Sequence, residues 1–567
     1  MKRRKFIKNI GAGALTPLAF NGVPLRLLGA ENVLNKMAVQ STNDHVLIIL
    51  QLIGGNDALN TFVPINDYDQ YAQLRPNIAI PKEGSRAYIP LDSTVESAAQ
   101  VGLHPDMMDF KDLYDSGKAA VFQSVGYENM SGSHFRGTDI IFQGIEGGGD
   151  DQDSGWLGRY VGSSVRPSVF PNDFPSEENP HPLALETGAG VSSLLLHPGS
   201  VPTSLSLGQD PSDLGATIRR LSGFGEGDDL ATRGKAPDFL NGTFYNDELN
   251  AILSLENQTE VYLQRIADIY NNSAATSVEY PTEYPFETSQ RKENPLSEQL
   301  QLVARLLGGG IRTKVFRVTI GGFDTHGNQV SETDATTGIH AALLYHVCSA
   351  MKAFQQDLAN RGLEDRVLTA TISEFGRRIP SNGSRGTAHG RGGAVMMFGK
   401  NLNPGIYGNT PNLNQDNIEY QLDYRQVFAN LLHEWMGVSQ EILANEIFFR
   451  DFIAGASPLG GDFEPLDIVA NNTVTSTEHL QSNYHIKAIY PNPANRYTQI
   501  EVFVNNHQQI SVELLTLSGK VVARTGRKVP PGSHAFMFVT SKIQPGFYLI
   551  KVKSERMDET KRLLIRH

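Results

Sequence analysis

The sequence predicts an α/β protein with a mostly parallel sheet flanked by helices, followed by a small all-β sandwich. Apolar runs at 46–53, 315–320 and 366–372 each end at glycine or a polar cluster, as buried strands of parallel sheets do. Helix-period patterns lie around and between the later runs. After residue 486 the chain changes to short alternating strands separated by turns, which is typical of a sandwich.

Composition and charge limit the classes of function. The 567 residues are 40% hydrophobic and 19% charged, as in a soluble globular protein of several domains. The net charge of −12 divides into +6 for residues 1–30, −26 for residues 31–484 and +8 for residues 485–567. Because residues 31–484 are strongly negative and repel polyanions, we expect no nucleic-acid partner. The single cysteine, Cys348, lies in an apolar helical pattern and is predicted to be a buried, inert thiol.

The N-terminus has the pattern of a signal peptide, assigned to residues 1–30. Residues 2–8 read K-R-R-K-F-I-K and precede a weakly apolar stretch at 10–20. Arg3-Arg4 followed by Phe6 resembles a twin-arginine export signal; an ordinary basic N-terminus is the alternative. No later stretch is apolar enough to span a bilayer, so we expect no transmembrane anchor.

The first predicted strand, 46–53, ends at Gly54-Gly55, with Asp57 just beyond. Ligands collect at the carboxyl ends of strands in parallel sheets, so Asp57 is a candidate ligand-binding residue. A turn or a helix cap is the alternative for this aspartate.

A second strand, 119–125, leads into Y-E-N-M-S-G-S-H-F-R at 127–136. Ser131 and Ser133 precede a helical pattern, so either could be an N-cap. The same position would present a hydroxyl where a helix N-terminus favours an anion. Farther on, the acidic loop 147–155 lacks the EF-hand spacing, which argues against a calcium site there. Residues 246–271 have the apolar period of a packed helix.

The strand at 315–320 ends at Gly321-Gly322 and is followed by Asp324 and His326. In extended chain, residues two apart point to the same side, so this carboxylate and imidazole can share a metal ion or a proton. Helices are predicted at 296–307 and 339–359.

The strand at 366–372 is followed directly by Ser373-Glu374. A strand–helix–strand crossover keeps strands parallel, so Glu374 is predicted at the same sheet edge as Asp324. The glycine-rich loop 381–393 then carries His389 and Arg391. A surface position is the alternative for His389. Residues 456–484 read as a linker, and 485–567 form the predicted sandwich.

Four segments together resemble the DUF1501 family, whose fold is similar to the alkaline phosphatase/sulfatase superfamily. They are L-I-G-G-N-D-A-L-N-T (52–61), G-S-H-F-R (132–136), G-G-F-D-T-H-G-N-Q (321–329), and S-E-F-G-R-R with G-T-A-H-G-R-G-G (373–378 and 386–393). The resemblance covers residues 44–455 and implies an alkaline-phosphatase-like domain there. It implies a divalent metal ion (zinc, manganese or calcium) with Ser133 as nucleophile, and metal ligands at Asp57, Asp324, His326, Glu374 and His389.

The sequence departs from the family pattern at Ala388, which stands where an aspartate is expected and could cost one metal ion of a pair. Arg391 could compensate by binding an anionic oxygen.

The motifs Y-P-N-P (490–493), L-S-G-K (517–520) and G-F-Y-L-I-K-V (546–552) resemble a type A sorting domain of the type IX secretion system.

Together these features predict a secreted or surface-attached protein, exported through the periplasm by the twin-arginine-like and type IX machineries. The expected function is metal-dependent hydrolysis of a phosphate or sulfate ester, with a small anionic ester as substrate. The alternative is a non-catalytic surface binding or assembly protein that retains the hydrolase fold.

Overall fold

A computed structural model describes the strands 19–20 and 23–24 and residues 44–145, 153–165, 176, 179–187, 191–198, 201–207, 262, 265–470, 484–490, 494–504, 508–516, 520–530, 532–554 and 558–566. The chain divides into two units, residues 1–470 and 471–567.

The first unit is built on one nine-stranded sheet among the described residues. Its order is β11 (Ser204–Leu207), β8 (Ala184–Thr187), β12 (Val315–Gly321), β3 (Val46–Ile53), β13 (Val367–Ile372), β14 (Gly393–Phe398), β7 (Ala119–Gly126) and β15 (Gly405–Tyr407), with β16 (Leu422–Asp423) beside β7. In this sheet β14 pairs antiparallel with both neighbours, and the other pairings are parallel. The predicted α/β class with a mostly parallel sheet is confirmed.

Strand β3 lies at the centre, and its apolar run is buried from Val46 to Leu52. It pairs in parallel with β12 on one side and β13 on the other, so all three strands end at one edge. In the register Gly321 lies opposite Ile53, and Ile372 lies opposite Gln51. The residues that follow these strands therefore begin at nearly the same level.

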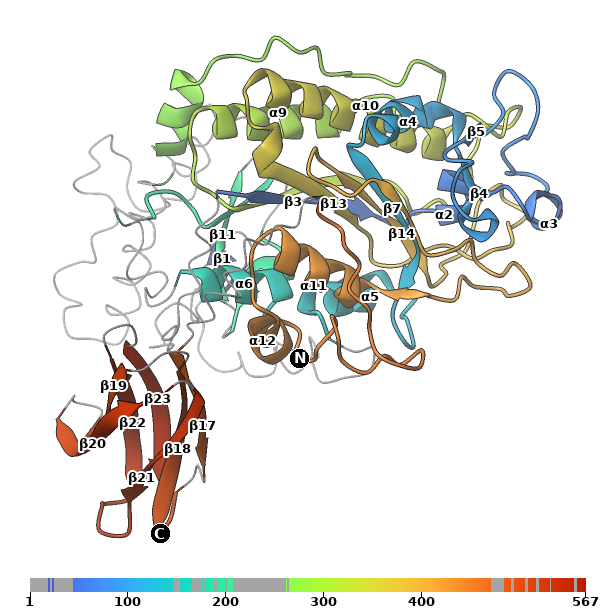
Figure 1. The fold of residues 1–567 in the computed structure, drawn as a ribbon. Coiled ribbons are helices and arrows are strands. Elements are labelled where there is room, and N and C mark those ends of the chain that lie inside the picture. The colour runs from blue at the N-terminus through green and yellow to red at the C-terminus, as the bar shows by residue number, and fades with distance from the viewer. Residues whose placement is uncertain are drawn as a thin grey trace, which may run out of the picture. The chain divides into compact units, whose positions relative to one another are not determined.

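Helices cover both faces of the sheet (Figure 1). One face carries α4 (Met108–Asp115), α9 (Pro295–Gly308) and α10 (Ile339–Asn360), and the other carries α5 (His134–Gln143), α6 (Trp156–Ser164) and α11 (Tyr424–Glu434). Cys348 lies in α10 with no exposed surface, and burial raises the pKa of its thiol well above the ordinary value. A buried thiol that stays protonated is the predicted inert cysteine.

Smaller elements complete the first unit. β4 (Phe62–Pro64), β6 (Val101–Leu103) and β5 (Ile89–Pro90) form a three-stranded sheet, and two short antiparallel pairs are β1 (Ala19–Phe20) with β2 (Val23–Pro24) and β9 (Leu196–His197) with β10 (Val201–Pro202). The short helices are α2 (Ala58–Thr61), α3 (Tyr68–Leu74), η2 (Ser97–Ala99), η3 (Pro105–Met107), η4 (Ser193–Leu195), η7 (Glu364–Arg366), α12 (Gln440–Ile442) and η8 (Leu443–Ile447).

The second unit is a pair of antiparallel sheets. One contains β17 (Tyr484–Tyr490), β18 (Tyr497–Val504) and β21 (Gly532–Val539); the other contains β20 (Val521–Val529), β19 (Gln508–Thr516), β22 (Gly546–Lys553) and β23 (Asp558–Ile565). A single apolar core draws residues from both sheets, among them Ile500, Val502, Ile510, Val512 and Ile550. The all-β character is confirmed, and β17 is a strand that the sequence reading did not identify.

Several sequence predictions fall outside the described residues: most of the signal peptide 1–30, the loop at 146–152, the helix at 246–261 and the linker from 471 to 483. These, and the domain boundaries drawn from the sequence, stay predictions. Within the described ranges, no helix is both long enough and apolar enough to pass through a membrane.

Candidate metal centre

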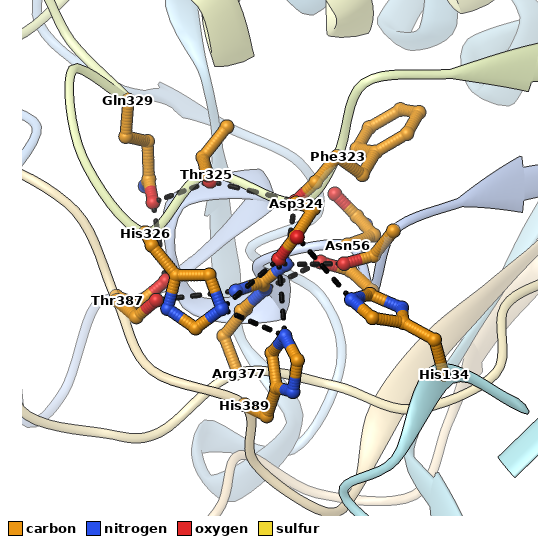
Figure 2. Close-up of polar contacts among 12 residues, drawn as sticks. Asn56, His134, Phe323, Asp324, Thr325, His326, Gln329, Arg377, Thr387 and His389 are labelled. Carbon is orange, nitrogen blue, oxygen red and sulfur yellow. Dashed lines mark hydrogen bonds and ion pairs between the residues drawn. The ribbon is translucent and has the colours of Figure 1, made fainter. Parts of the chain in front are cut away.

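Polar side chains gather where the central strands of the first unit end (Figure 2). Asp324 and His326 follow β12, and Glu374 follows β13. His134 opens helix α5, which follows β7, and His389 precedes β14. Because β14 runs opposite to its neighbours, its beginning lies at the edge where they end; Gly393 is paired with Val125 near the end of β7. The antiparallel strand thus brings His389 to the site.

Three ligand-type atoms converge at this edge. The Oδ1 atom of Asp324 lies 3.0 Å from Nε2 of His389 and 3.2 Å from Nε2 of His326. The two Nε2 atoms lie 2.8 Å from each other. When metal–ligand bonds are about 2.0–2.1 Å long, neighbouring ligand atoms lie roughly 2.9–3.4 Å apart in octahedral or tetrahedral geometry. The observed separations are close to those of ligands that share one cation.

The orientation of His389 leaves its inner nitrogen available for a metal. Its Nδ1 lies 2.8 Å from the carbonyl oxygen of Gly132, and a carbonyl can only accept, so Nδ1 carries the proton. In the neutral ring, Nε2 then presents a lone pair to the carboxylate of Asp324. Two electron-rich atoms 3.0 Å apart require a proton or a cation between them, and fixing the outer nitrogen in this way is typical of metal-binding histidines.

His134 approaches the other carboxylate oxygen in the same manner. Its Nε2 lies 3.2 Å from Oδ2 of Asp324, and its Nδ1 lies 2.8 Å from Oε1 of Glu374. Nitrogen and oxygen atoms of His134, Asp324 and His389 all lie within 4.8 Å of one another. Glu374 Oε1 also accepts a 2.8 Å hydrogen bond from the Gly54 N–H. Glu374 therefore orients His134 from the side away from Asp324, while its Oε2 is buried and has no hydrogen-bond partner among the described residues.

The protonation tendencies fit a metal-binding role. Partial burial would raise the pKa of Asp324, but the hydrogen bond from Arg377, the polar contact with His389 and the charge of Arg377 bring it well below the ordinary value. Burial lowers the pKa of His326, although the nearby Asp324 opposes this shift. An ionised carboxylate and a neutral imidazole are the forms that bind a metal ion.

Arg377 is a fixed cation beside the cluster. It is fully buried, and its Nη2 donates to Oδ1 of Asp324 over 2.7 Å. Its remaining hydrogen bonds go to the backbone oxygens of Gly54, Gly55, Phe323 and Thr387. Arg377 thus ties the loops after β3 and β12 together and neutralises part of the charge on Asp324.

Gly54 makes the close approach of these loops possible. It has φ +122°, and a Cβ atom at this position would lie 2.2 Å from the Asp324 backbone nitrogen. No side chain fits at this distance, so the glycine that ends β3 permits the position of Asp324.

The structure places Asp57 apart from the cluster. Its carboxylate is buried, and Oδ2 accepts hydrogen bonds of 2.6 Å from both Arg75 and Gln329. Burial raises its pKa, but the charge and hydrogen bond of Arg75 outweigh this and lower it overall. Asp57 is the N-cap residue of α2, with no side-chain capping bond. It makes a buried ion pair rather than joining Asp324 and the histidines.

Ser133 lies at the exposed start of α5, between two residues that contact the cluster. Gly132 accepts from His389, and His134 lies beside Asp324. Ser133 is the N-cap residue, but its side chain makes no capping hydrogen bond. Its hydroxyl is therefore not committed to the helix end.

Arg391 is exposed and lines a different pocket, of about 420 Å³, together with Glu128, Asp416 and Tyr420. Ala388 lies next to the cluster residue His389, and its carbonyl accepts a hydrogen bond from the Arg378 N–H. The structure therefore brings together Asp324, His326, His389 and the supporting Glu374, but neither Asp57 nor the Arg391 side chain.

Two residues of the site were not identified from the sequence. His134 belongs to the motif G-S-H-F-R beside Ser133, and its position at the predicted helix start is the signal that places it with the other histidines. Arg377 stood in S-E-F-G-R-R, but nothing in the pattern separates a buried arginine from the exposed one beside it, Arg378.

A pocket of about 640 Å³ opens beside the cluster, with Asp324, His134 and Glu374 in its wall. It is the space through which a small molecule could reach these side chains. Phe135, with 76% of its surface exposed, and Arg291 also line it.

The fold and the site define an α/β protein with a candidate metal centre, and family comparisons agree with the resemblances drawn from its motifs. Residues 242–450 match the family described as "Protein of unknown function (DUF1501)". Residues 488–566 match the "Secretion system C-terminal sorting domain". Both resemblances are confirmed. The sorting domain marks the protein as secreted or displayed at the cell surface by the type IX machinery. No curated protein sequence matches the chain.

Solved structures give distant similarities. A protein in the alkaline phosphatase superfamily from Vibrio parahaemolyticus is 8% identical, with 91% of this chain and 89% of that chain covered and a TM-score of 0.31. Alkaline phosphatase from the Antarctic bacterium TAB5 is 12% identical, with 64% and 94% covered and a TM-score of 0.24.

Latent PorU from Porphyromonas gingivalis is 18% identical, with a TM-score of 0.13, and the alignment covers 14% of this chain and 9% of PorU. With TM-scores this low, these similarities carry no conclusion about activity.

Proposed function

We propose that this protein is an exported, metal-dependent hydrolase of phosphate or sulfate esters. The observation that carries the proposal is the convergence of Asp324 Oδ1, His326 Nε2 and His389 Nε2 within 3.2 Å of one another. Two imidazole nitrogens and a carboxylate oxygen form a donor set used by catalytic zinc. Calcium takes oxygen donors, so among zinc, manganese and calcium the nitrogen-rich set favours zinc or manganese.

The residues around the cluster fit one cation better than two. Asp57 is paired with Arg75 at 2.6 Å, so its charge is already neutralised. Arg377 donates to Asp324 at 2.7 Å and supplies a second, permanent positive charge beside the cluster. Together with Ala388 in place of a carboxylate, this supports a single metal ion held by Asp324 and the histidines.

In the proposed reaction Ser133 is the nucleophile. When bound, the metal ion acts as a Lewis acid that polarises the ester oxygens. Ser133 Oγ forms a bond to phosphorus or sulfur as the bond to the alcohol oxygen breaks, and the serine proton passes through solvent to the departing alcohol. Water then cleaves the seryl ester, which restores the serine hydroxyl and releases inorganic phosphate or sulfate. His134, positioned by Glu374 and adjacent to Ser133, orients the start of the helix toward the cluster.

A second candidate function, a binding or assembly protein that retains the fold, is favoured by a specific observation. Arg391, expected to hold an anionic oxygen, lines a separate pocket, so the reaction would lack that contact. This candidate predicts a co-purifying protein or glycan and no ester hydrolysis.

The test is hydrolysis of p-nitrophenyl phosphate and p-nitrophenyl sulfate by the full chain supplied with zinc or manganese. Ser133→Ala is expected to reduce turnover by on the order of 10³-fold without loss of bound metal. Ser116→Ala, at the exposed end of α4, is the matched control and is expected to leave the rate unchanged. If the Ser133→Ala variant turns over as fast as the wild type, Ser133 is not the nucleophile. If the metal-loaded wild type hydrolyses no ester in a broad panel, the binding or assembly function is favoured instead.

A further inference from the structure

Among the described residues, the wall of the 640 Å³ pocket beside the cluster contains one arginine, Arg291. Its other ionisable lining residues are His134 and three carboxylates, those of Asp139, Asp324 and Glu374. A pocket for an anionic ester needs a positive group beside the anion's oxygens that offsets part of this negative charge. Arg291 is the permanent positive charge positioned to do so.

The backbone of the neighbouring loop makes room for the Arg291 guanidinium. A Cβ atom at Gly322, which has φ +119°, would lie 2.4 Å from Nε of Arg291 and 2.9 Å from its Cζ. Gly322 is two residues before Asp324. The guanidinium therefore lies against the same loop that presents Asp324, and a side chain at 322 would displace it.

Arg291 itself has a left-handed backbone with φ +63°, which is uncommon for a residue with a side chain. The surrounding hydrogen bonds hold this conformation. The buried ring of His346 donates from Nε2 to the Arg291 carbonyl oxygen over 2.7 Å. Just after Arg291, the Lys292 carbonyl oxygen accepts from the Tyr284 N–H, and the Asn294 N–H donates to the Thr282 carbonyl oxygen. A residue fixed in a strained conformation at a pocket wall suggests a functional requirement.

The Arg291 side chain is exposed, and no carboxylate in the described ranges forms an ion pair with it. By contrast, the arginines at 317, 377 and 385 each pair with an acidic side chain. A guanidinium presents a planar fork of N–H donors that matches two oxygens of a tetrahedral oxyanion.

We propose that Arg291 binds the tetrahedral oxyanion, phosphate or sulfate, of a ligand that occupies this pocket. The inference rests on the proposed function, because it assigns Arg291 to the anionic group of the same ester. It also explains how residues 31–484, which are strongly negative, admit an anionic molecule: the attraction is local, at the Arg291 side of the pocket. Arg291 is a binding residue and takes no proton in the reaction.

The test is calorimetric titration of the full chain, of known metal content, with inorganic phosphate and separately with inorganic sulfate. Arg291→Asn removes the charge while keeping a residue that tolerates left-handed backbone. We expect anion affinity to fall about 10- to 100-fold, as for loss of charged hydrogen bonds, with metal content and unfolding midpoint unchanged. The two titrations show which oxyanion the pocket prefers.

Lys292→Asn is the matched control, because it removes the same charge one residue further on. Its ammonium group donates to the carbonyl oxygen of Phe286 and does not line the pocket. This variant is expected to bind both anions within twofold of wild type. Wild-type affinity in folded Arg291→Asn, or no anion binding by the wild type, would overturn the inference. A wild type that binds phosphate but holds no metal would contradict the proposed function and leave the assignment of Arg291 standing.

Discussion

The Asp57–Arg75 pair offers a direct test of whether Asp57 is a structural residue. In the variant Asp57→Asn, Arg75 remains fully buried without the carboxylate that lies 2.6 Å away. Removing one member of a buried pair costs about 3–5 kcal/mol, because the other charge is left uncompensated. Arg75 would keep hydrogen bonds to the oxygens of Ile379, Asn60 and Arg378 at 2.7 to 2.9 Å.

With those neutral acceptors retained, we expect a loss at the lower end, about 3 kcal/mol, or roughly 150-fold in the unfolding equilibrium. The assay is urea denaturation followed by tryptophan fluorescence. Both tryptophans, Trp156 and Trp435, are buried in the first unit, so the signal reports that unit. The control Asp69→Asn breaks the exposed pair with Lys82 and is expected to leave the transition unchanged.

The same samples separate two roles for Asp57. If Asp57 is a structural residue, its replacement destabilises the fold but leaves the metal content of the folded protein unchanged. If Asp57→Asn unfolds at the wild-type urea concentration, or remains folded and loses its metal, the ion-pair account is refuted and Asp57 is a ligand as the family resemblance implied.

Three further outcomes are expected. Glu374→Gln weakens the orientation of His134 and should lower metal affinity about 10-fold or more, measured by competition with a chelator, while the circular dichroism spectrum stays that of the wild type. Gly54→Ala places a Cβ atom against the Asp324 backbone nitrogen and should lower both metal affinity and unfolding midpoint; wild-type values would show that the loops can separate without cost. Burial lowers the pKa of His340 to about 4 from 6.5, so the unfolded chain takes up the extra proton first and stability should fall as pH drops from about 6.5 to 4. A flat profile there would refute this. His340→Gln should make the fall shallower without abolishing it, because burial also lowers the pKa of His104 and His346.

The central strands could be predicted from sequence because their burial is continuous. The predicted strand 46–53 coincides with β3, and the predicted helix 339–359 differs from α10 by one residue. Continuous apolar runs and regular periods survive any tertiary context. The four-residue strands β8 and β11 carry too short a pattern, and β14, which reads G-A-V-M-M-F, follows a glycine-rich loop without a turn signal of its own.

From the sequence, only those residues of the candidate site that directly follow predicted parallel strands could be placed together. Asp324 and Glu374 follow parallel strands, so their shared edge could be inferred. The partner of Asp57 could not, because Arg75 reaches it from the end of helix α3 across an irregular turn. Likewise, the placement of His389 depends on the antiparallel direction of β14, which a local pattern does not reveal.

The central claim is that Asp324 and its neighbouring histidines hold one divalent cation. Elemental analysis of the folded full chain, dialysed after loading with zinc or manganese, tests it most directly when wild type is compared with Asp324→Asn. The account predicts about one metal ion per wild-type chain and none retained by the variant. A wild type free of metal, or a variant that retains the wild-type amount, would contradict it.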